Sequence, residues 1–410
     1  MANNFTGENT AAKTVREPLF HIVKKNNVTT KQAVIIRTIA VLSGFIFSAL
    51  LCLILVGANP IEFVAQMFMG AFGTGNRIWD LLKETALLLG VGLALIPAFK
   101  MKFWNLGGNG QILMGALAAA ACMITMEGKA SDGVIILCMI PASILAGAIW
   151  AVIPAIFKAF FKTNETLFTL MMNYIAVGIV SICISVWDRT GSQTIGIIPS
   201  GHLPILGNKN LLTILVVAVL TALMFVYLKF SKHGYELSVV GESENTARYI
   251  GLNVKKVIIR TMVLSGAICG IIGLLLAGAI NHTISDTTAR NLGFTAIIVA
   301  WLAKFNPLMM ILTSFFVAFM TKGMGQVQSF FGISSNAVCD LIIAIMYFFV
   351  IGCEFFITYK IIRRKKGDKK ADGDNNGKCK FTEFFKNLFS KKKKAAENEN
   401  SEVKAEGGNE

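Results

Sequence analysis

Charged residues are scarce in this chain. They make up only 15% of its 410 residues, whereas 54% of the residues are hydrophobic. A chain of this composition cannot bury its long apolar stretches inside a soluble core, so we predict an all-α polytopic membrane protein. The net charge of +15 does not indicate a nucleic-acid partner, because Lys and Arg are concentrated in the tails and in alternate loops between apolar runs.

Motifs of catalysis and metal binding are missing as well. The chain has no GxxxxGKS or GxxxxGKT phosphate loop, no HExxH zinc motif and no GxSxG nucleophile elbow. The cysteines show no disulfide or metal-ligand spacing. The histidines are expected to lie apart from one another, at His21, His202, His233 and His282. We therefore predict a chain that catalyses no reaction and holds no metal or cofactor of its own.

Ionisable residues are also rare inside the apolar runs, where they would usually mark an ion-coupled carrier. The exceptions are Asp340 and Glu354, which fall near predicted membrane ends. We favour carboxylates that reach interfacial water or cap a helix over an ion relay. An ion-coupled carrier and a membrane-embedded enzyme, such as a lipid-modifying transferase, are rival hypotheses, but both lack their expected chemistry here.

About ten apolar runs predict membrane segments. They cover 38–56, 85–99, 111–126, 134–157, 166–186, 211–230, 261–280, 294–303, 307–320 and 337–359. The runs at 294–303 and 307–320 are shorter than the roughly 20 residues of a straight crossing. They are predicted to be either two thin spans or a re-entrant pair.

The basic loops set the predicted orientation. Cationic residues precede the first run and recur in the loops near residues 100, 160, 230 and 256, which predicts that both termini are cytosolic. The expected organisation is a cytosolic N-terminal tail at 1–32, a transmembrane domain at 33–360 and a cytosolic tail at 361–410. The polar stretch at 231–260, between two apolar runs, is predicted to be a cytosolic loop.

The C-terminal tail changes character abruptly. It is basic and rich in Gly, Asp and Asn before an end rich in Glu, Asn and Ala, so we predict that most of it is disordered. Within it, the Phe and Leu spacing at 381–390, followed by a run of lysines, predicts an amphipathic helix lying on anionic membrane lipid. A disordered segment that merely contains Phe is the alternative.

Several polar or aromatic residues inside the apolar region are candidates for the path of a solute. The glycines and amides between Asn105 and Gln111 predict a break where the chain re-enters the membrane, used either as a tight turn or for substrate contact. Asn173 lies about two helical turns into its span, where a helix-to-helix hydrogen bond is favoured over a place in the pathway. Trp301 offers an aromatic face for stacking, or serves as an interfacial tryptophan.

The GxxxG spacing of Gly266 and Gly270 predicts close packing between helices.

Four segments together carry a family resemblance. They are NLGGNGQ at 105–111, NETLFTLMMNYIA at 164–176, the polar insert within 230–273, and GFTAIIVAWLAKFNP at 293–307. In this order they resemble the permease subunits of ATP-binding-cassette (ABC) importers for branched-chain amino acids, ribose-type sugars and nucleosides. The 164–176 segment is similar to the nucleoside branch. The resemblance covers roughly residues 38–359.

The resemblance implies a permease subunit in a bacterial plasma membrane that works by alternating access. Its implied partners are a cytosolic ATPase that carries the ATP and Mg, a second homologous permease, and an extracytoplasmic substrate-binding lipoprotein. The implied ATPase-coupling residues are Glu242, Glu244, Ala247, Arg248, Tyr249 and Gly251. The scarcity of buried cations argues for a neutral small polar solute, for which nucleosides are the first expectation and ribose-type sugars the second.

Overall fold

The computed structural model describes residues 20–25, 30–188 and 194–363. The chain divides into two compact units, of which the larger is Thr29–Phe356. The described part of the smaller unit contains an antiparallel strand pair, β1 (Phe20–Lys24) and β2 (Tyr359–Arg363), with Phe20 opposite Arg363. This pair was not predicted. The amphipathic helix predicted at 381–390 lies outside the described residues, as does most of both tails.

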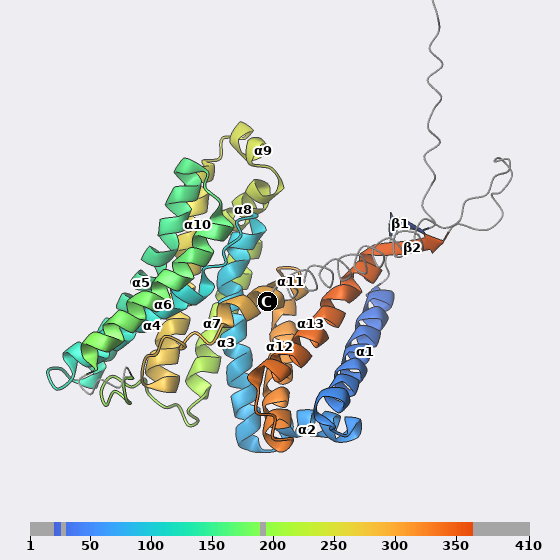
Figure 1. Cartoon of the computed structure of the whole chain (residues 1–410). Helices are drawn as coiled ribbons and strands as arrows, with labels where there is room; N and C mark the ends of the chain where they lie inside the picture. The colour runs from blue at the N-terminus through green and yellow to red at the C-terminus, as the bar shows by residue number, and fades with distance from the viewer. Residues whose placement is uncertain (1–19, 26–29, 189–193, 364–410) are drawn as a thin grey trace, which may run out of the picture. The chain divides into compact units, whose positions relative to one another are not determined.

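The larger unit is built of helices (Figure 1). Their bounds are α1 (Thr30–Val56), α2 (Pro60–Phe72), α3 (Gly75–Lys100), α4 (Gly108–Met126), α5 (Asp132–Phe161), α6 (Glu165–Trp187), α7 (Leu211–Phe230), α8 (Lys232–Glu242), α9 (Glu244–Tyr249), α10 (Val254–Leu275), the π-helical η1 (Leu276–Asn281), α11 (Leu292–Leu302), α12 (Pro307–Phe330) and α13 (Asn336–Thr358). Among the described residues, nine helices are long and apolar enough to cross a membrane, and α11 is a shorter apolar helix. The prediction of about ten membrane segments is confirmed.

The two short predicted runs turn out to be unequal. The first is the 11-residue α11, whereas the second extends to the 24-residue α12. The predicted run ended at residue 320, ten residues before the end of α12, because the last turns of this helix carry polar side chains. One of these, Gln326, donates a hydrogen bond to Gln66 of α2 at 3.3 Å, so the polar turns pack on a neighbouring helix.

Asparagine side chains begin several of these helices. Asn59 accepts a hydrogen bond from the Ile61 amide just before α2, and Pro60 occupies the first helical position. Asn164 caps α6, and Asn306 caps α12 in the same way. These side chains satisfy amides that have no partner within the helix. Helix α2 was missed by the sequence analysis although Asn59-Pro60 is a start signal.

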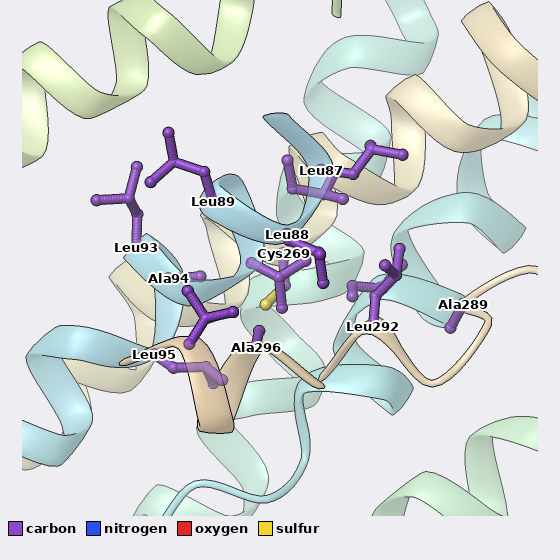
Figure 2. Packing of buried hydrophobic residues seen from close by; sticks show 14 of the residues in the cluster. Leu87, Leu88, Leu89, Leu93, Ala94, Leu95, Cys269, Ala289, Leu292 and Ala296 are labelled. Atoms are coloured by element: carbon purple, nitrogen blue, oxygen red, sulfur yellow. The ribbon is translucent and has the colours of Figure 1, made fainter. Parts of the chain in front are cut away.

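The core of the unit lies around α3. Its apolar window is 89% buried, compared with 28% for α1, α7 and α13, which marks α3 as central and the other three as peripheral. Figure 2 shows Leu87 and Leu88 of α3 close to Cys269 of α10 and to Leu292 and Ala296 of α11. The short helix α11 is therefore packed against the most buried span.

Glycines bring α5 and α10 into backbone contact. Gly266 and Gly270 of α10 lie against the backbone of Gly147 and Ser143 of α5, where an added Cβ would collide. A Cβ at Gly115 of α4 would lie 2.6 Å from the Cα of Gly270. The predicted close packing at the GxxxG spacing is confirmed.

Candidate functional site

The break between α3 and α4 is organised by buried amides. The Asn105 side chain is fully buried; its Oδ1 accepts hydrogen bonds from the Gly107 amide at 3.0 Å and from Gln111 Nε2 at 3.2 Å. Its Nδ2 donates to Ser265 Oγ of α10 at 3.2 Å. The predicted pathway residues Asn105 and Gln111 thus lie together in a buried network, where their amide groups hold the turn in shape.

Asn173 of α6 holds the other side of this turn. Its Oδ1 accepts a hydrogen bond from the Gly110 amide at 2.8 Å, and its Nδ2 donates to the Leu106 carbonyl at 2.8 Å. The side chain is buried, and a Cβ at Gly110 would lie 3.0 Å from its Oδ1. The favoured hydrogen bond between membrane segments is present, although its partner is backbone rather than a side chain. A role in substrate contact stays a prediction.

The start of α11 meets the start of α4 inside the bundle. Asn109 Oδ1 accepts a hydrogen bond from the Gly293 amide at 2.7 Å, and its Nδ2 lies 3.5 Å from Asn291 Oδ1. The close approach requires glycine, because a Cβ at Gly293 would lie 2.6 Å from the Asn109 nitrogen. The N-termini of α4 and α11, each with a partial positive charge, therefore meet inside the bundle.

Trp301 lies on α11 away from the amide network. Its ring is 5.4 Å from that of Trp104 and 6.2 Å from that of Phe305, measured between centroids. In the part of the chain that the structure describes, no hydrogen bond or ring contact joins it to Asn105, Gln111 or Asn173. Half of Trp301 is exposed, and Asn291 and Phe294 are also exposed along this helix.

One buried carboxylate was missed by the sequence analysis. Glu84 of α3 is only 6% exposed, and its Oε2 lies 3.6 Å from Arg290 Nη1 and 3.6 Å from Lys322 Nζ. The apolar run was started at Thr85, which placed Glu84 in a loop. The signal that could have found it is Thr74, which caps α3 by accepting a hydrogen bond from Arg77 and sets the helix start well before Glu84. Glu84 is therefore a buried carboxylate within α3 that the sequence analysis did not count among the ionisable residues of the spans.

Glu354 is also held by cations. Its carboxylate lies 2.6 Å from Arg37 of α1 and 2.8 Å from Lys304, which precedes α12. The side chain therefore joins three segments of the bundle through ion pairs. The sequence analysis had predicted a carboxylate that reaches interfacial water or caps a helix, and it did not predict these ion pairs. No charged partner within 4 Å is described for Asp340, the other carboxylate singled out from the sequence.

The predicted coupling residues lie together at the end of α8, on α9 and in the turn that follows α9. Helix α8 is held to α10 by an ion pair between Glu236 and Arg260, 2.6 Å apart. The hydrogen bond from Arg260 to this carboxylate lowers the pKa of Glu236. The end of α8 also rests on the end of α3, because Gly241 packs against the Lys100 carbonyl. The segment that carries α9 is thus docked on two spans.

Helix α9 presents an exposed tip. Tyr249 is 91% exposed, and Arg248 forms an ion pair with Glu244 at 3.5 Å on the surface. Ala247 is fully buried and anchors the helix from below. The helix ends at a turn where Gly251 has a φ of +84°, a conformation that favours glycine. Glu242, the remaining predicted coupling residue, is exposed at the end of α8.

A groove of about 680 Å³ lies beside α9. It is lined by Lys158 of α5 and Lys162 just after that helix, by Glu244 and Arg248 of α9, and by residues 252–255 at the turn into α10. Lys255 also lies 4.5 Å above the ring of Phe160. The exposed tip of α9 therefore stands next to a largely basic hollow.

Two histidines were wrongly expected to lie apart. The rings of His202 and His282 are 4.0 Å apart, and the Ile198 amide donates a hydrogen bond to the His282 carbonyl at 2.9 Å. This pair joins the loop before α7 to the end of η1. Across the described ranges, no group of three or more His, Cys, Asp or Glu residues is placed to hold a metal ion.

The nine apolar helices of membrane-spanning length among the described residues define a multi-pass integral membrane protein. The family described as "branched-chain amino acid transport system / permease component" matches residues 78–351. The chain belongs to this family of ABC transporter permeases, as the sequence resemblance predicted.

Three relatives match over most of their own length. A guanosine ABC transporter permease of Bacillus subtilis is 28% identical over 325 residues, covering 77% of this chain and 92% of the relative. A nucleoside ABC transporter permease of Lactococcus lactis is 26% identical over 360 residues, covering 83% and 96%. A glucose ABC transporter permease of Haloferax volcanii is 25% identical over 340 residues, covering 78% and 88%. These relatives are transporter permease proteins rather than enzymes.

Proposed function

We propose that this chain is the transmembrane permease subunit of an ATP-driven importer for nucleosides. The observation that carries the coupling part of the proposal is the exposed tip of α9 on a docked α8, with Tyr249 91% exposed. The nucleoside part is supported by the guanosine and nucleoside permeases among the relatives. ATP and Mg belong to a separate ATPase, and this chain hydrolyses nothing.

The coupling follows from how α8 and α9 are attached. A cytosolic ATPase that binds the α9 tip displaces α8, and α8 passes the force to α10 through Glu236 and Arg260. The contact between Gly241 and the Lys100 carbonyl passes it to α3. Because α3 is the most buried span, its displacement moves the helices around it and drives alternating access.

The exposed side of α11 is the proposed wall of the solute path. Asn291, Phe294 and Trp301 are exposed there, although α11 begins inside the bundle. A polar amide at this depth needs water, protein or solute as a partner, since lipid offers none. One amide at the N-cap and two aromatic groups on the same helix suit a neutral solute that has both hydroxyl groups and a flat base.

The complete importer contains further partners. A second, homologous permease forms the path with this chain, and an extracytoplasmic lipoprotein delivers the solute. A ribose-type or other simple sugar is the second candidate solute, favoured by the glucose permease among the relatives. An ion-coupled carrier is the rival mechanism. In that mechanism Glu84, as a buried carboxylate with two cationic partners, would be the residue that binds the coupling ion.

Uptake measurements test the proposal. Cells expressing the chain with its partners are given labelled guanosine, inosine, uridine, ribose or glucose, with and without an ionophore at constant ATP. We expect nucleoside uptake that survives the ionophore, and Trp301→Ala is expected to reduce it at unchanged membrane levels. Uptake of sugar alone would overturn the nucleoside assignment. Loss of uptake on collapse of the ion gradients would overturn ATP-driven transport.

A further inference from the structure

The ion pairs of Glu84 connect three separate segments. Glu84 is on α3, Lys322 is on α12, and Arg290 is in the loop immediately before α11. Both cations lie 3.6 Å from the same carboxylate oxygen, Oε2. Their side chains are partly exposed, at 44% for Arg290 and 32% for Lys322, whereas the Glu84 side chain is only 8% exposed. The carboxylate of Glu84 is therefore buried, and its two cationic partners are partly exposed to solvent.

The position of Glu84 makes this arrangement costly to disturb. Glu84 lies nine residues after the start of α3 at Gly75, which places it about 14 Å along the helix axis. Its Oε2 is buried and accepts no hydrogen bond among the described residues. The two cations are then its charge partners. Removing either cation leaves the buried carboxylate poorly compensated, which is costly for a charge held away from water.

The loop that holds Arg290 needs such an attachment. Arg290 and Asn291 have φ values of 42° and 55°. Asn tolerates this left-handed region, but a residue such as Arg rarely adopts it. Their neighbours Ala289 and Leu292 are both buried and belong to the hydrophobic core. The strained turn is thus fixed by apolar packing on either side, by Asn109 at Asn291, and by Glu84 at Arg290.

We propose that Glu84 is a positioning residue for transport. Its carboxylate holds Arg290 and Lys322 and, through Arg290, fixes the first residues of α11 where that helix meets α4. The inference rests on the proposed solute path along α11. Glu84 acts through its charge on other residues of the chain, not by touching the solute.

A carboxylate supplied from solution tests this role. Replacing Glu84 by Ala removes the carboxylate and opens a space beside two partly exposed cations, which acetate can enter. We expect Glu84→Ala to lower the maximal uptake rate at least tenfold with a smaller change in KM, and acetate to restore a measurable part of that rate. Glu84→Gln fills the space without a charge, so it should lose uptake and show no acetate rescue. Glu62→Ala, at an exposed glutamate of α2, is the matched control and should behave as the parent in both buffers.

A second measurement covers variants that insert poorly. In the purified full chain in nanodiscs, acetate should raise the melting temperature of Glu84→Ala but not that of the parent, of Glu84→Gln or of Glu62→Ala. This readout does not depend on which solute is transported, so it can fail or succeed separately from the nucleoside assignment. Parent-like uptake by Glu84→Gln, or an absence of acetate rescue in both assays, would overturn the positioning role. Acetate-insensitive loss of uptake in Glu84→Ala, together with ionophore-sensitive uptake by the parent, would assign Glu84 to an ion relay instead.

Discussion

The carboxylate of Glu236 and the guanidinium of Arg260 join α8 to α10, with Oε2 and Nη2 only 2.6 Å apart. The Glu236 side chain is 11% exposed and that of Arg260 is 32% exposed. A hydrogen bond between charged groups contributes roughly 1.5–3 kcal/mol. This pair is therefore a strong attachment for the segment that presents α9.

The pH dependence of this attachment follows from the lowered pKa of Glu236. A carboxyl group with a lower pKa in the folded state stabilises that state above its unfolded pKa and loses the contribution as pH falls through the folded value. We expect α8 to stay docked from neutral pH to below the usual range of glutamate. Hydrogen exchange of the α8 amides, corrected for intrinsic rates, measures this. In Arg260→Gln the main cause of the lowered pKa is gone, so protection at neutral pH should be lower and should fall less on acidification. An unchanged profile would contradict the assignment.

Replacing Tyr249 by Glu should uncouple the ATPase from transport. The side chain is 91% exposed, so a charge there costs little in folding but disrupts a contact made at the tip of α9. We expect normal membrane levels and at least a tenfold loss of uptake, with basal ATP hydrolysis retained in the reconstituted importer. Tyr235→Glu, at an exposed tyrosine of α8, is the control and should have the smaller effect. Full uptake by Tyr249→Glu would remove α9 from the coupling surface.

Replacing Asn173 by Ala should reduce stability. The change leaves the Gly110 amide and the Leu106 carbonyl without their partner. Each unsatisfied buried group costs about 1–3 kcal/mol. The midpoint of unfolding in mixed SDS and detergent micelles should therefore fall clearly. The sequence analysis favoured a helix-to-helix hydrogen bond for Asn173 over a place in the pathway, and parent-like stability of the variant would contradict that structural role.

Replacing Gly270 by Ala should separate helices that now touch. The added methyl group meets the Ser143 carbonyl, and backbone cannot move aside as a flexible side chain can. We expect a loss of about 1–3 kcal/mol from overpacking. Gly178→Ala in α6, where nothing lies within 4 Å of the new Cβ, is the matched control. It should be neutral or stabilising, because alanine favours helix over glycine. Equal stability of the two variants would show that α5 and α10 can adjust.

The sequence predicted the spans well because their dominant signal is apolar length. It failed where polar side chains lie inside a helix and meet partners that are distant in sequence. Glu84 and its two cations are one case, since Arg290 and Lys322 follow it by more than 200 residues. The strand pair of β1 and β2 is another, because its residues lie at opposite ends of the chain.

The candidate site was predicted as a set of residues but not as an arrangement. The NLGGNGQ stretch was correctly expected to form a break, because glycines and amides suit irregular backbone at membrane depth. Its closure by Asn173, and the meeting of Asn109 with Gly293, depend on how distant helices pack. The tilted ring contact between Trp301 and Trp104 likewise arises only after folding. Local patterns reveal which groups need partners, and the fold determines which partners they obtain.

The backbone contact between α5 and α10 limits how the larger unit can change shape. With no side chains between Gly147, Gly266 and Gly270, there is no soft layer that would let one helix slide along the other. The contact of Gly115 with Gly270 extends this restriction to α4. These three helices should therefore turn together as one rigid lever during a transport cycle, with bending confined to the loops and side-chain interfaces around them.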